Sequence, residues 1–129
     1  MRLVYLSLTG NVKEFVSKTG MESIELDFFD PLIEVDEDYV IVVPSYDDNI
    51  TDTISEFIDY KSNHRYLKGF AGSGSLNYNE HFCFNAKDLS MKYNKPLIYK
   101  FEFCGRDIDV INFKKEVKLL GITRTSEEN

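Results

Sequence analysis

The sequence predicts a single α/β domain, a three-layer sandwich with a five-stranded parallel sheet between two layers of helices. Short apolar runs alternate along the 129 residues with segments whose apolar positions recur at helical spacing. Strands that alternate with helices form parallel sheets through right-handed crossovers. Five strands suit the order 2-1-3-4-5, which places a ligand crevice at the carboxyl ends of strands 1 and 3.

The first predicted elements are a buried strand, a helix and an edge strand. Residues 2–7 are an unbroken run of mainly aliphatic side chains, as a central strand requires. Residues 12–20 have helical spacing, and Gly20 is the expected C-terminal stop. Residues 24–28 alternate apolar and acidic side chains, which is typical of an edge strand.

A third strand is predicted over residues 39–43. It ends at Pro44, which has no N–H for the ladder and a restricted φ, and residues 45–50 are expected to be loop. Thr53 and Glu56 have the spacing of a capping box, so a helix is expected to begin there.

The second half of the chain predicts two more strands and two more helices. Residues 67–74 are a fourth strand that ends in glycines, and a helix is expected from about Glu80. Residues 96–103 are the fifth strand. Asp107 is the expected N-cap of a closing helix that reaches Leu120.

Composition limits the class of protein and its partners. The formal charge of -7 repels nucleic acid and anionic membrane surfaces, so neither is expected as a partner. The apolar run that ends at Ser7 has only four residues, 3–6, which is too few for a signal-peptide core or a membrane span, and a cytoplasmic location is expected. One core suits this length, so we assign residues 1–122 to the domain and residues 123–129 to a polar, flexible tail. A monomer is expected when the protein is free.

Cys83 and Cys104 are the only cysteines, and they lie 21 positions apart. Neither C-x-x-C spacing nor a neighbouring histidine cluster accompanies them, so no metal site or redox dithiol is indicated. We expect both to be buried free thiols.

Three loops are expected to meet at the carboxyl edge of the sheet, over residues 7–12, 45–50 and 73–79. The first offers two hydroxyls, one amide and backbone N–H groups at a helix N-terminus, where the helix dipole favours a phosphate. The alternative is that Thr9 and Asn11 only cap the helix.

The second and third loops each carry an aromatic side chain, Tyr46 and Tyr78, next to small polar residues. Aromatic rings that flank a crevice stack on flat ligands, although a loop tyrosine is also a common surface residue. Together with a phosphate loop, the two tyrosines favour a ligand that has both a phosphate and a flat ring.

Several other chemistries are excluded by missing patterns. The chain has neither the G-x-x-x-x-G-K-[S/T] loop of nucleotide triphosphatases nor the G-x-G-x-x-G dinucleotide fingerprint. No G-x-S-x-G elbow accompanies His64 or His81. A phospho-accepting receiver domain needs carboxylates where this chain has Ser7 and Ser45.

The motif S-L-T-G-N-V, residues 7–12, resembles the phosphate loop for flavin mononucleotide (FMN) in flavodoxins, roughly T/S-x-T-G-N-T. Over about residues 2–120 the chain more closely resembles the NrdI family of flavodoxin-like proteins, which partner the small subunit of class I ribonucleotide reductase. The matching motifs are V-P-S-Y at 43–46, G-S-G-x-x-N-Y at 72–78 and K-F-E-F-C-G at 100–105.

The resemblance implies a flavodoxin-like fold, FMN as cofactor and a redox accessory role. In that family reduced FMN reacts with oxygen, and the superoxide supports assembly of the manganese and tyrosyl-radical cofactor of the small subunit. A related subclass supports modification of the tyrosine itself. Because no segment offers a nicotinamide-nucleotide site, electrons are expected from a separate flavodoxin reductase or similar donor, and the flavin rather than a side chain carries the chemistry.

The resemblance and the loop positions together assign a set of residues to the FMN site. They are Ser7, Leu8, Thr9, Gly10, Asn11, Val12, Ser45, Tyr46, Asp47, Asp48, Ser73, Gly74, Asn77 and Tyr78. Val12 stands where many members have threonine, and Asp47-Asp48-Asn49 stands where they often have glycines. We hypothesise that one of these aspartates disfavours the anionic reduced flavin.

Two alternatives remain open at this point. An ordinary flavodoxin passes electrons without making an oxygen species, although its chain is commonly longer and its rim more acidic. A flavodoxin-like scaffold without cofactor would serve only to dock.

Overall fold

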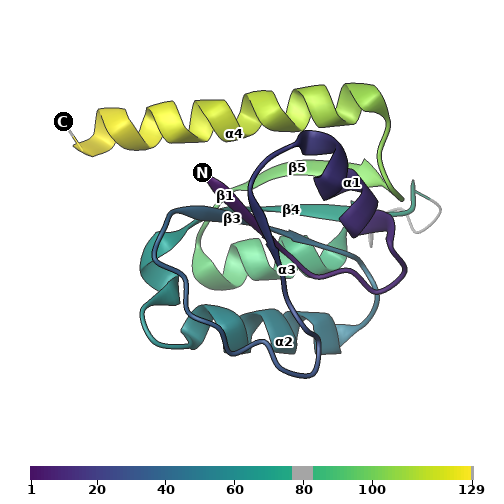
Figure 1. The fold of residues 1–129 in the computed structure, drawn as a ribbon, viewed down its shortest axis with the longest axis horizontal. Helices are drawn as coiled ribbons and strands as arrows, with labels where there is room; N and C mark the ends of the chain where they lie inside the picture. The colour runs from purple at the N-terminus through teal and green to yellow at the C-terminus, as the bar shows by residue number, and fades with distance from the viewer. Residues whose placement is uncertain (77–82, 129) are drawn as a thin grey trace.

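The computed structural model describes residues 1–76 and 83–128, with side chains as far as residue 121. Five strands form one sheet in the order β2-β1-β3-β4-β5, and every neighbouring pair is parallel. Helices α1 and α4 cover one face, and α2 and α3 cover the other (Figure 1). The predicted three-layer flavodoxin-like sandwich and its strand order are therefore confirmed.

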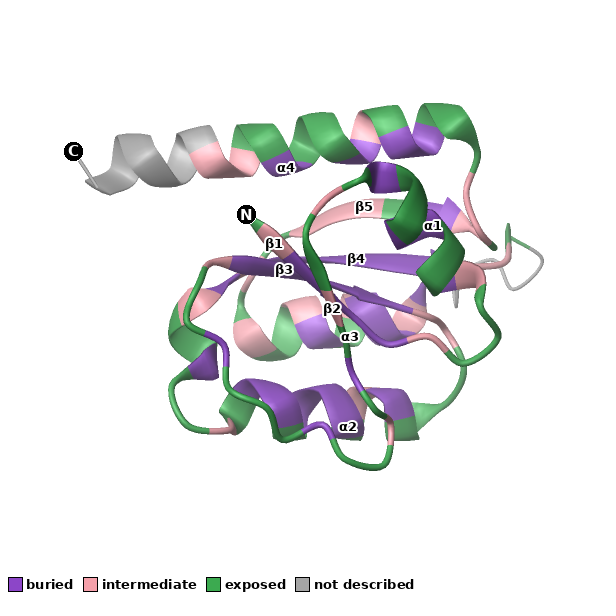
Figure 2. Cartoon of the chain, viewed as in Figure 1, coloured by how far each residue is buried: buried purple, intermediate pink, exposed green. Residues whose placement is uncertain are grey.

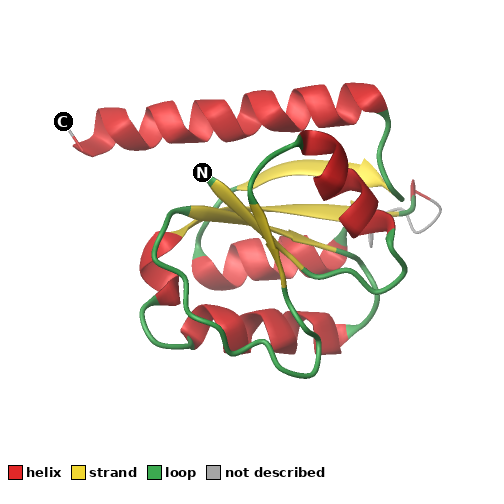
Figure 3. Ribbon diagram, in the orientation of Figure 1, coloured by secondary structure: helices red, strands yellow, loops and turns green. Residues whose placement is uncertain are grey.

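Strands and helices alternate along the chain, and loops connect them at both edges of the sheet (Figure 3). The elements are β1 Arg2–Tyr5, α1 Asn11–Thr19, β2 Ser23–Glu25, β3 Tyr39–Val43, α2 Asp48–Asp59, the 3₁₀ turn η1 Asn63–Tyr66, β4 Leu67–Gly74, α3 Phe84–Tyr93, β5 Leu97–Glu102 and α4 Asp107–Glu128.

Two apolar cores lie on opposite faces of the sheet. Alternation along β3 sends Val40 and Val42 towards α1 and α4, and Ile41 and Val43 towards α2 and α3. All five residues of β3 are buried, which Figure 2 shows as a continuous purple strand. A strand that is buried on both faces needs an unbroken apolar run, and this explains why the sequence predicted β3 correctly.

Asn63 is a buried polar residue at the end of the sheet opposite the predicted site. Its side-chain oxygen accepts from the Val35 N–H at 2.9 Å, and its amide donates to the carbonyls of Ile33 and Phe57 at 2.8 Å each. These bonds fasten the long connection between β2 and β3 to the end of α2. A fully buried amide of this kind is stable only because its polar atoms are paired.

The start of α2 differs from the sequence prediction. The helix begins at Asp48, inside the predicted loop, and the Asp47 carboxylate caps it by accepting from the Asn49 N–H at 2.9 Å. Asp is a strong N-cap, so Asp47 starts the helix before the Thr53 hydroxyl can act as a cap. Thr53 lies buried in the middle of α2, and the prediction of a capping box there was wrong.

Strand β2 is shorter than predicted, and it is followed by a tight turn. The Asp27 carboxylate accepts from the Phe29 N–H at 2.9 Å, and the Asp30 N–H donates to the Asp27 carbonyl at 3.1 Å. An aspartate that bonds the backbone two residues on favours a turn over a strand. The prediction followed the alternating apolar and acidic pattern, and it therefore placed the end of the strand beyond Glu25, where β2 ends in the structure.

The last two helices have different limits from those predicted. Helix α3 begins at Phe84, and the predicted start near Glu80 lies outside the described residues. Helix α4 begins at Asp107 and runs to Glu128, beyond the predicted end at Leu120. Its backbone continues through residues 122–128, where no proline interrupts it.

The two cysteines differ in exposure. Cys83 is buried at the start of α3, and burial raises the pKa of its thiol to about 12, so it is an unreactive free thiol. Cys104 is also free but only partly buried, because it lies in the turn that follows β5, and the prediction that both are buried was wrong for it. Within the described residues, no helix is long and apolar enough to cross a membrane.

Asp109 caps α4 from inside the helix. Its carboxylate accepts from the Arg106 N–H at 2.8 Å and from the Tyr99 hydroxyl at 2.7 Å, and it pairs with the Arg106 guanidinium. The cap is therefore supplied by the third helical residue and not, as predicted, by Asp107. The Arg106 hydrogen bond is the largest influence that lowers the pKa of Asp109 to about 2.

We expect Asp109→Asn to lower the free energy of unfolding at pH 7 by about 1 kcal/mol, a value discounted because the Arg106 side chain is exposed. The Asp109 pKa is depressed in the folded state, so its stabilisation is complete above the unfolded value near 4 and is lost as the pH falls towards 2. Urea unfolding from pH 7 to pH 2 should show the gap between the two proteins closing only below about pH 4. A gap independent of pH would contradict this role.

Candidate functional site

The loops after β1, β3, β4 and β5 surround a cavity of about 210 Å³ at the carboxyl edge of the sheet. This is the edge that the predicted strand order assigned to a ligand. Within the described residues, the lining carries hydroxyls, one amide and two aromatic rings, and it contains no Asp, Glu, His, Lys or Arg. The lining residues are Leu8, Thr9, Asn11, Pro44, Ser45, Tyr46, Ser73, Gly74, Ser75 and Phe103.

The first loop turns at Gly10 into helix α1. Gly10 is the N-cap residue and has φ +93, a left-handed conformation that glycine adopts without steric cost. The Ser7 hydroxyl, three residues before this N-cap, accepts from the Lys13 N–H at 3.2 Å and so satisfies one of the free N–H groups in the first turn of α1. Thr9 and Asn11 line the cavity in front of the helix N-terminus, where the dipole favours an anion.

Two residues of the predicted phosphate loop are placed differently from the rest. The Val12 side chain is 1% exposed and belongs to the core under α1, so only its backbone faces the loop. Ser7 lines a neighbouring hollow at the end of β2, together with Asp27 and Phe28. The structure therefore brings Leu8, Thr9 and Asn11 to the cavity, and leaves Ser7 and Val12 beside it.

The second loop is held by a buried amide from α3. Asn85 accepts from the Tyr46 N–H at 2.9 Å, and its amide donates to the Asp47 carbonyl at 2.9 Å and to the Thr51 hydroxyl at 3.1 Å. Asn85 is fully buried, whereas Tyr46 is 68% exposed and is one of the residues that line the cavity. Asp47 and Asp48 are exposed and do not line the cavity.

A chain of hydrogen bonds joins the second loop to the ends of β4 and β5. The Ser45 hydroxyl donates to the Ser73 carbonyl at 2.7 Å, and the Ser73 hydroxyl donates to the Phe103 carbonyl at 2.6 Å. The Phe103 N–H returns to the Gly74 carbonyl at 3.1 Å. Three loops are thus held in one arrangement before any ligand binds.

Two glycines of β4 allow α3 to approach the site closely. A Cβ at Gly72 would lie 2.7 Å from the Ala86 Cβ, and a Cβ at Gly74 would lie 2.9 Å from the Cys83 nitrogen. The G-S-G motif is therefore explained by close packing of α3 against the strand, which places Asn85 next to the second loop.

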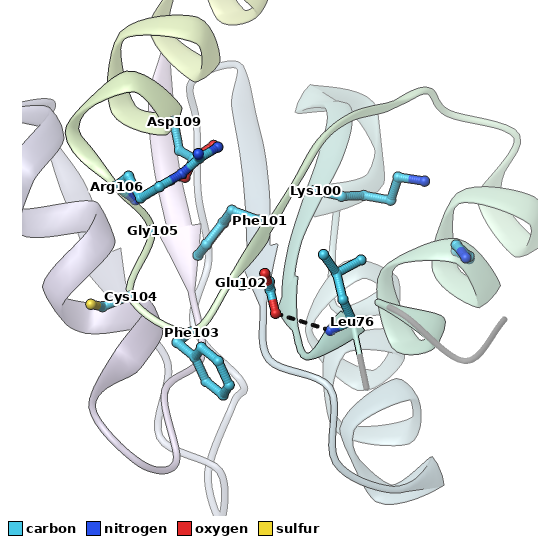
Figure 4. Close-up of a pocket in the computed structure, with 10 residues that line it drawn as sticks. Leu76, Lys100, Phe101, Glu102, Phe103, Cys104, Gly105, Arg106 and Asp109 are labelled. Atoms are coloured by element: carbon cyan, nitrogen blue, oxygen red, sulfur yellow. Dashed lines mark hydrogen bonds and ion pairs between the residues drawn. The ribbon is translucent and has the colours of Figure 1, made fainter. Parts of the chain in front are cut away.

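A second cavity of about 800 Å³ lies beyond β4, alongside the end of β5 (Figure 4). Lys87, Lys100 and Arg106 contribute positive charge to its lining, while its two carboxylates already accept hydrogen bonds. Glu102 accepts from the Leu76 N–H at 3.1 Å, and Asp109 pairs with Arg106. Phe103 lines both cavities.

Two of the predicted site residues, Asn77 and Tyr78, lie outside the described residues. Conversely, sequence reasoning missed Asn85 and Phe103. No local pattern marks Asn85, because its role depends on three partners that are distant in sequence. Phe103 belongs to the K-F-E-F-C-G motif, where the alternating pattern places it in the strand instead of in a turn.

The chemistry of the smaller cavity fits a flavin that carries a phosphate. Its lining combines hydroxyl and amide groups, among them Thr9 and Asn11 at the N-terminus of α1, with the aromatic residues Tyr46 and Phe103. The absence of carboxylates among the described lining residues removes charge repulsion against the phosphate. This arrangement favours FMN binding over simple capping by Thr9 and Asn11.

Comparison with known proteins agrees with this interpretation. A family model described as NrdI flavodoxin-like matches residues 3–115. Among solved structures, a short-chain flavodoxin associated with a bacterial microcompartment is similar, with a TM-score of 0.62 and 20% sequence identity. The alignment covers 95% of this chain and 96% of that one, and at this identity it supports the fold alone.

Proposed function

The chain belongs to the NrdI flavodoxin-like family, and from this premise we propose that it binds FMN and activates a class I ribonucleotide reductase small subunit. When bound and reduced, FMN would supply electrons to oxygen and so deliver superoxide for assembly of the radical cofactor. The observation that carries the proposal is the uncharged cavity where four loops meet in front of the α1 N-terminus.

In this proposal the protein's part is to bind and orient the cofactor. Thr9, Asn11 and the first N–H groups of α1 hold the phosphate, and the Gly10 turn allows them to converge. Tyr46 and Phe103 provide apolar contact for the flat ring. Asn85 and Ser73 keep the loops in place, so little ordering is needed on binding.

Charge is distributed unevenly along the chain, which supports docking partners of opposite kinds. Residues 19–60 contain 13 of the 22 acidic residues and no Lys, Arg or His. This segment includes β2, β3 and α2. In contrast, β5, which carries Lys100, is the edge strand farthest from β2, and α4, which carries Lys114 and Lys115, packs on the face opposite α2. Such a field orients incoming proteins. We assign a basic reductase, which supplies electrons, to the acidic side.

The test is a spectrum of the purified protein after incubation with FMN, followed by anaerobic reduction and exposure to oxygen with a superoxide probe. We expect the visible flavin bands, rapid reoxidation and superoxide, with faster assembly of the small-subunit radical when both proteins are present. A protein that binds FMN but is reoxidised slowly without superoxide would be an electron carrier. A protein that refuses FMN would be a docking scaffold.

We also expect the carboxylates after β3 to lower the flavin potential. Both are exposed, and Asp47 caps α2, so asparagine is the suitable replacement because it keeps the cap. The double change Asp47→Asn, Asp48→Asn should raise the midpoint potential by roughly 50 mV, since an exposed charge contributes about 1 kcal/mol. Dye-equilibration titration measures this value, and Glu56→Gln, farther along α2, should leave it unchanged. A potential that stays the same or falls in the double variant contradicts the hypothesis.

A further inference from the structure

Phe103 has an unusual backbone conformation for its size. It follows β5 with φ +50, in a turn closed by the Gly105 N–H, which donates to the Glu102 carbonyl at 2.8 Å. Phe103 is the first central residue of this turn and has a positive φ, whereas the second, Cys104, does not, which is the pattern of a type II′ turn. That position favours glycine, and a bulky residue there is strained.

The ring of Phe103 is not buried in the core, so core packing does not account for the strain. Its exposed fraction is 53%, whereas Phe101, two residues earlier, is 2% exposed and stacks on Phe15 with ring centroids 3.8 Å apart. Figure 4 shows the Phe103 ring at the end of β5. A strained residue whose side chain is half exposed is a candidate for a role in binding.

Both polar groups of the Phe103 backbone are held by β4. The carbonyl accepts from the Ser73 hydroxyl at 2.6 Å, and the N–H donates to the Gly74 carbonyl at 3.1 Å. Ser73 is itself 5% exposed and is fixed from the other side by Ser45, whose hydroxyl donates to the Ser73 carbonyl. The backbone of Phe103, and with it the direction of its Cα–Cβ bond, is therefore set before a ligand arrives.

The ring lines the 210 Å³ cavity as well as the larger cavity beyond it. Phe103 therefore stands at the boundary between the two cavities, and it shares the lining of the smaller one with Leu8 and Tyr46. A flat apolar ligand that enters this uncharged cavity meets Phe103 as part of its wall.

We propose that Phe103 is a direct aromatic contact of the flavin ring, and that Ser73 is the positioning residue that holds it. The inference rests on the proposed FMN site. The hydrogen bonds from β4 offset the backbone strain at Phe103, and the turn places the Phe103 ring in the lining of the cavity. A contact of this kind strengthens binding and perturbs the electronic environment of the flavin.

The test compares two replacements that separate the ring from the strain. Phe103→Ala removes the ring and keeps a Cβ at positive φ, whereas Phe103→Gly removes the ring and relieves the strain. We expect both to weaken FMN binding at least tenfold and to reduce the visible circular dichroism of bound FMN, while the apoprotein of Phe103→Gly melts at a higher temperature than that of Phe103→Ala. Phe29→Ala, at a ring 91% exposed outside the cavity, is the matched control and should bind FMN as the native protein does.

The same titration tests Ser73. We expect Ser73→Ala to reduce FMN affinity and the circular dichroism signal, and Ser73→Thr, which keeps the hydroxyl, to restore both. If both Phe103 variants bind FMN with native affinity and spectrum, the ring is not a flavin contact and the inference fails while the proposed function stands. If the native protein itself binds no FMN, both fail together.

Discussion

Asn11→Asp is expected to weaken FMN binding about a hundredfold while leaving the fold intact or slightly more stable. Asn11 is the first residue of α1 and lines the cavity at the proposed phosphate position. A new carboxylate there repels the phosphate by about 3 kcal/mol, since two unit charges 4 Å apart interact by about 4 kcal/mol at an effective ε near 20. The same carboxylate is favourable at a helix N-terminus, so the apoprotein should not lose stability.

Riboflavin, which has the ring without the phosphate, gives this prediction its control. Its affinity should change less than threefold between the native protein and Asn11→Asp, because the ring end of the cavity is unaltered. Fluorescence titration measures both ligands, and thermal unfolding of the apoprotein measures stability. If FMN and riboflavin lose affinity equally, or if neither does, the phosphate does not lie at α1.

The contrast between β3 and α2 shows which features of the fold can be predicted from the sequence. The strand β3 is buried on both faces, so its apolar run has a single structural interpretation. At α2 two capping candidates, Asp47 and Thr53, lie six positions apart, and both have suitable side chains. Which one starts the helix depends on the Asn85 bonds to the Asp47 loop and on burial of Thr53, and these are tertiary contacts.

The candidate site divides in a similar way. Thr9, Asn11, Ser45, Tyr46, Ser73 and Gly74 were predicted and line the cavity, because strand order alone brings the loops after β1, β3 and β4 to one edge. Phe103 was not, because a positive φ in a non-glycine residue has no signal in the sequence. Asn85 looked like an ordinary helical residue, and only its burial against the second loop identifies its role.

Asn85→Leu is expected to have the largest effect on stability, and it should also weaken FMN binding. The change keeps the branched shape of the side chain, but it leaves the part-buried Tyr46 N–H without its acceptor. It also removes one of the two hydrogen bonds that the Asp47 carbonyl accepts, the other coming from the Ile50 N–H at 3.2 Å. An unsatisfied buried group costs about 1–3 kcal/mol and each further lost hydrogen bond about 1 kcal/mol, so we expect the free energy of unfolding to fall by roughly 3 kcal/mol. The loop that carries Tyr46 then loses its tether, and FMN affinity should fall at least tenfold because the loop must be ordered on binding.

Asn63→Leu provides the matched comparison, since Asn63 is also a fully buried asparagine with three side-chain hydrogen bonds. It lies in η1, where β3 and β4 begin, whereas the cavity lies where those strands end. The two variants should lose similar free energies of unfolding in urea, but only Asn85→Leu should lose FMN affinity when both are titrated at a temperature at which they are folded. An equal loss of affinity would mean that general destabilisation weakens binding. Instability lowers the apparent affinity only in proportion to the unfolded fraction, which is small at this temperature. An unchanged FMN affinity in Asn85→Leu would therefore show that the loop after β3 needs no tether to bind FMN.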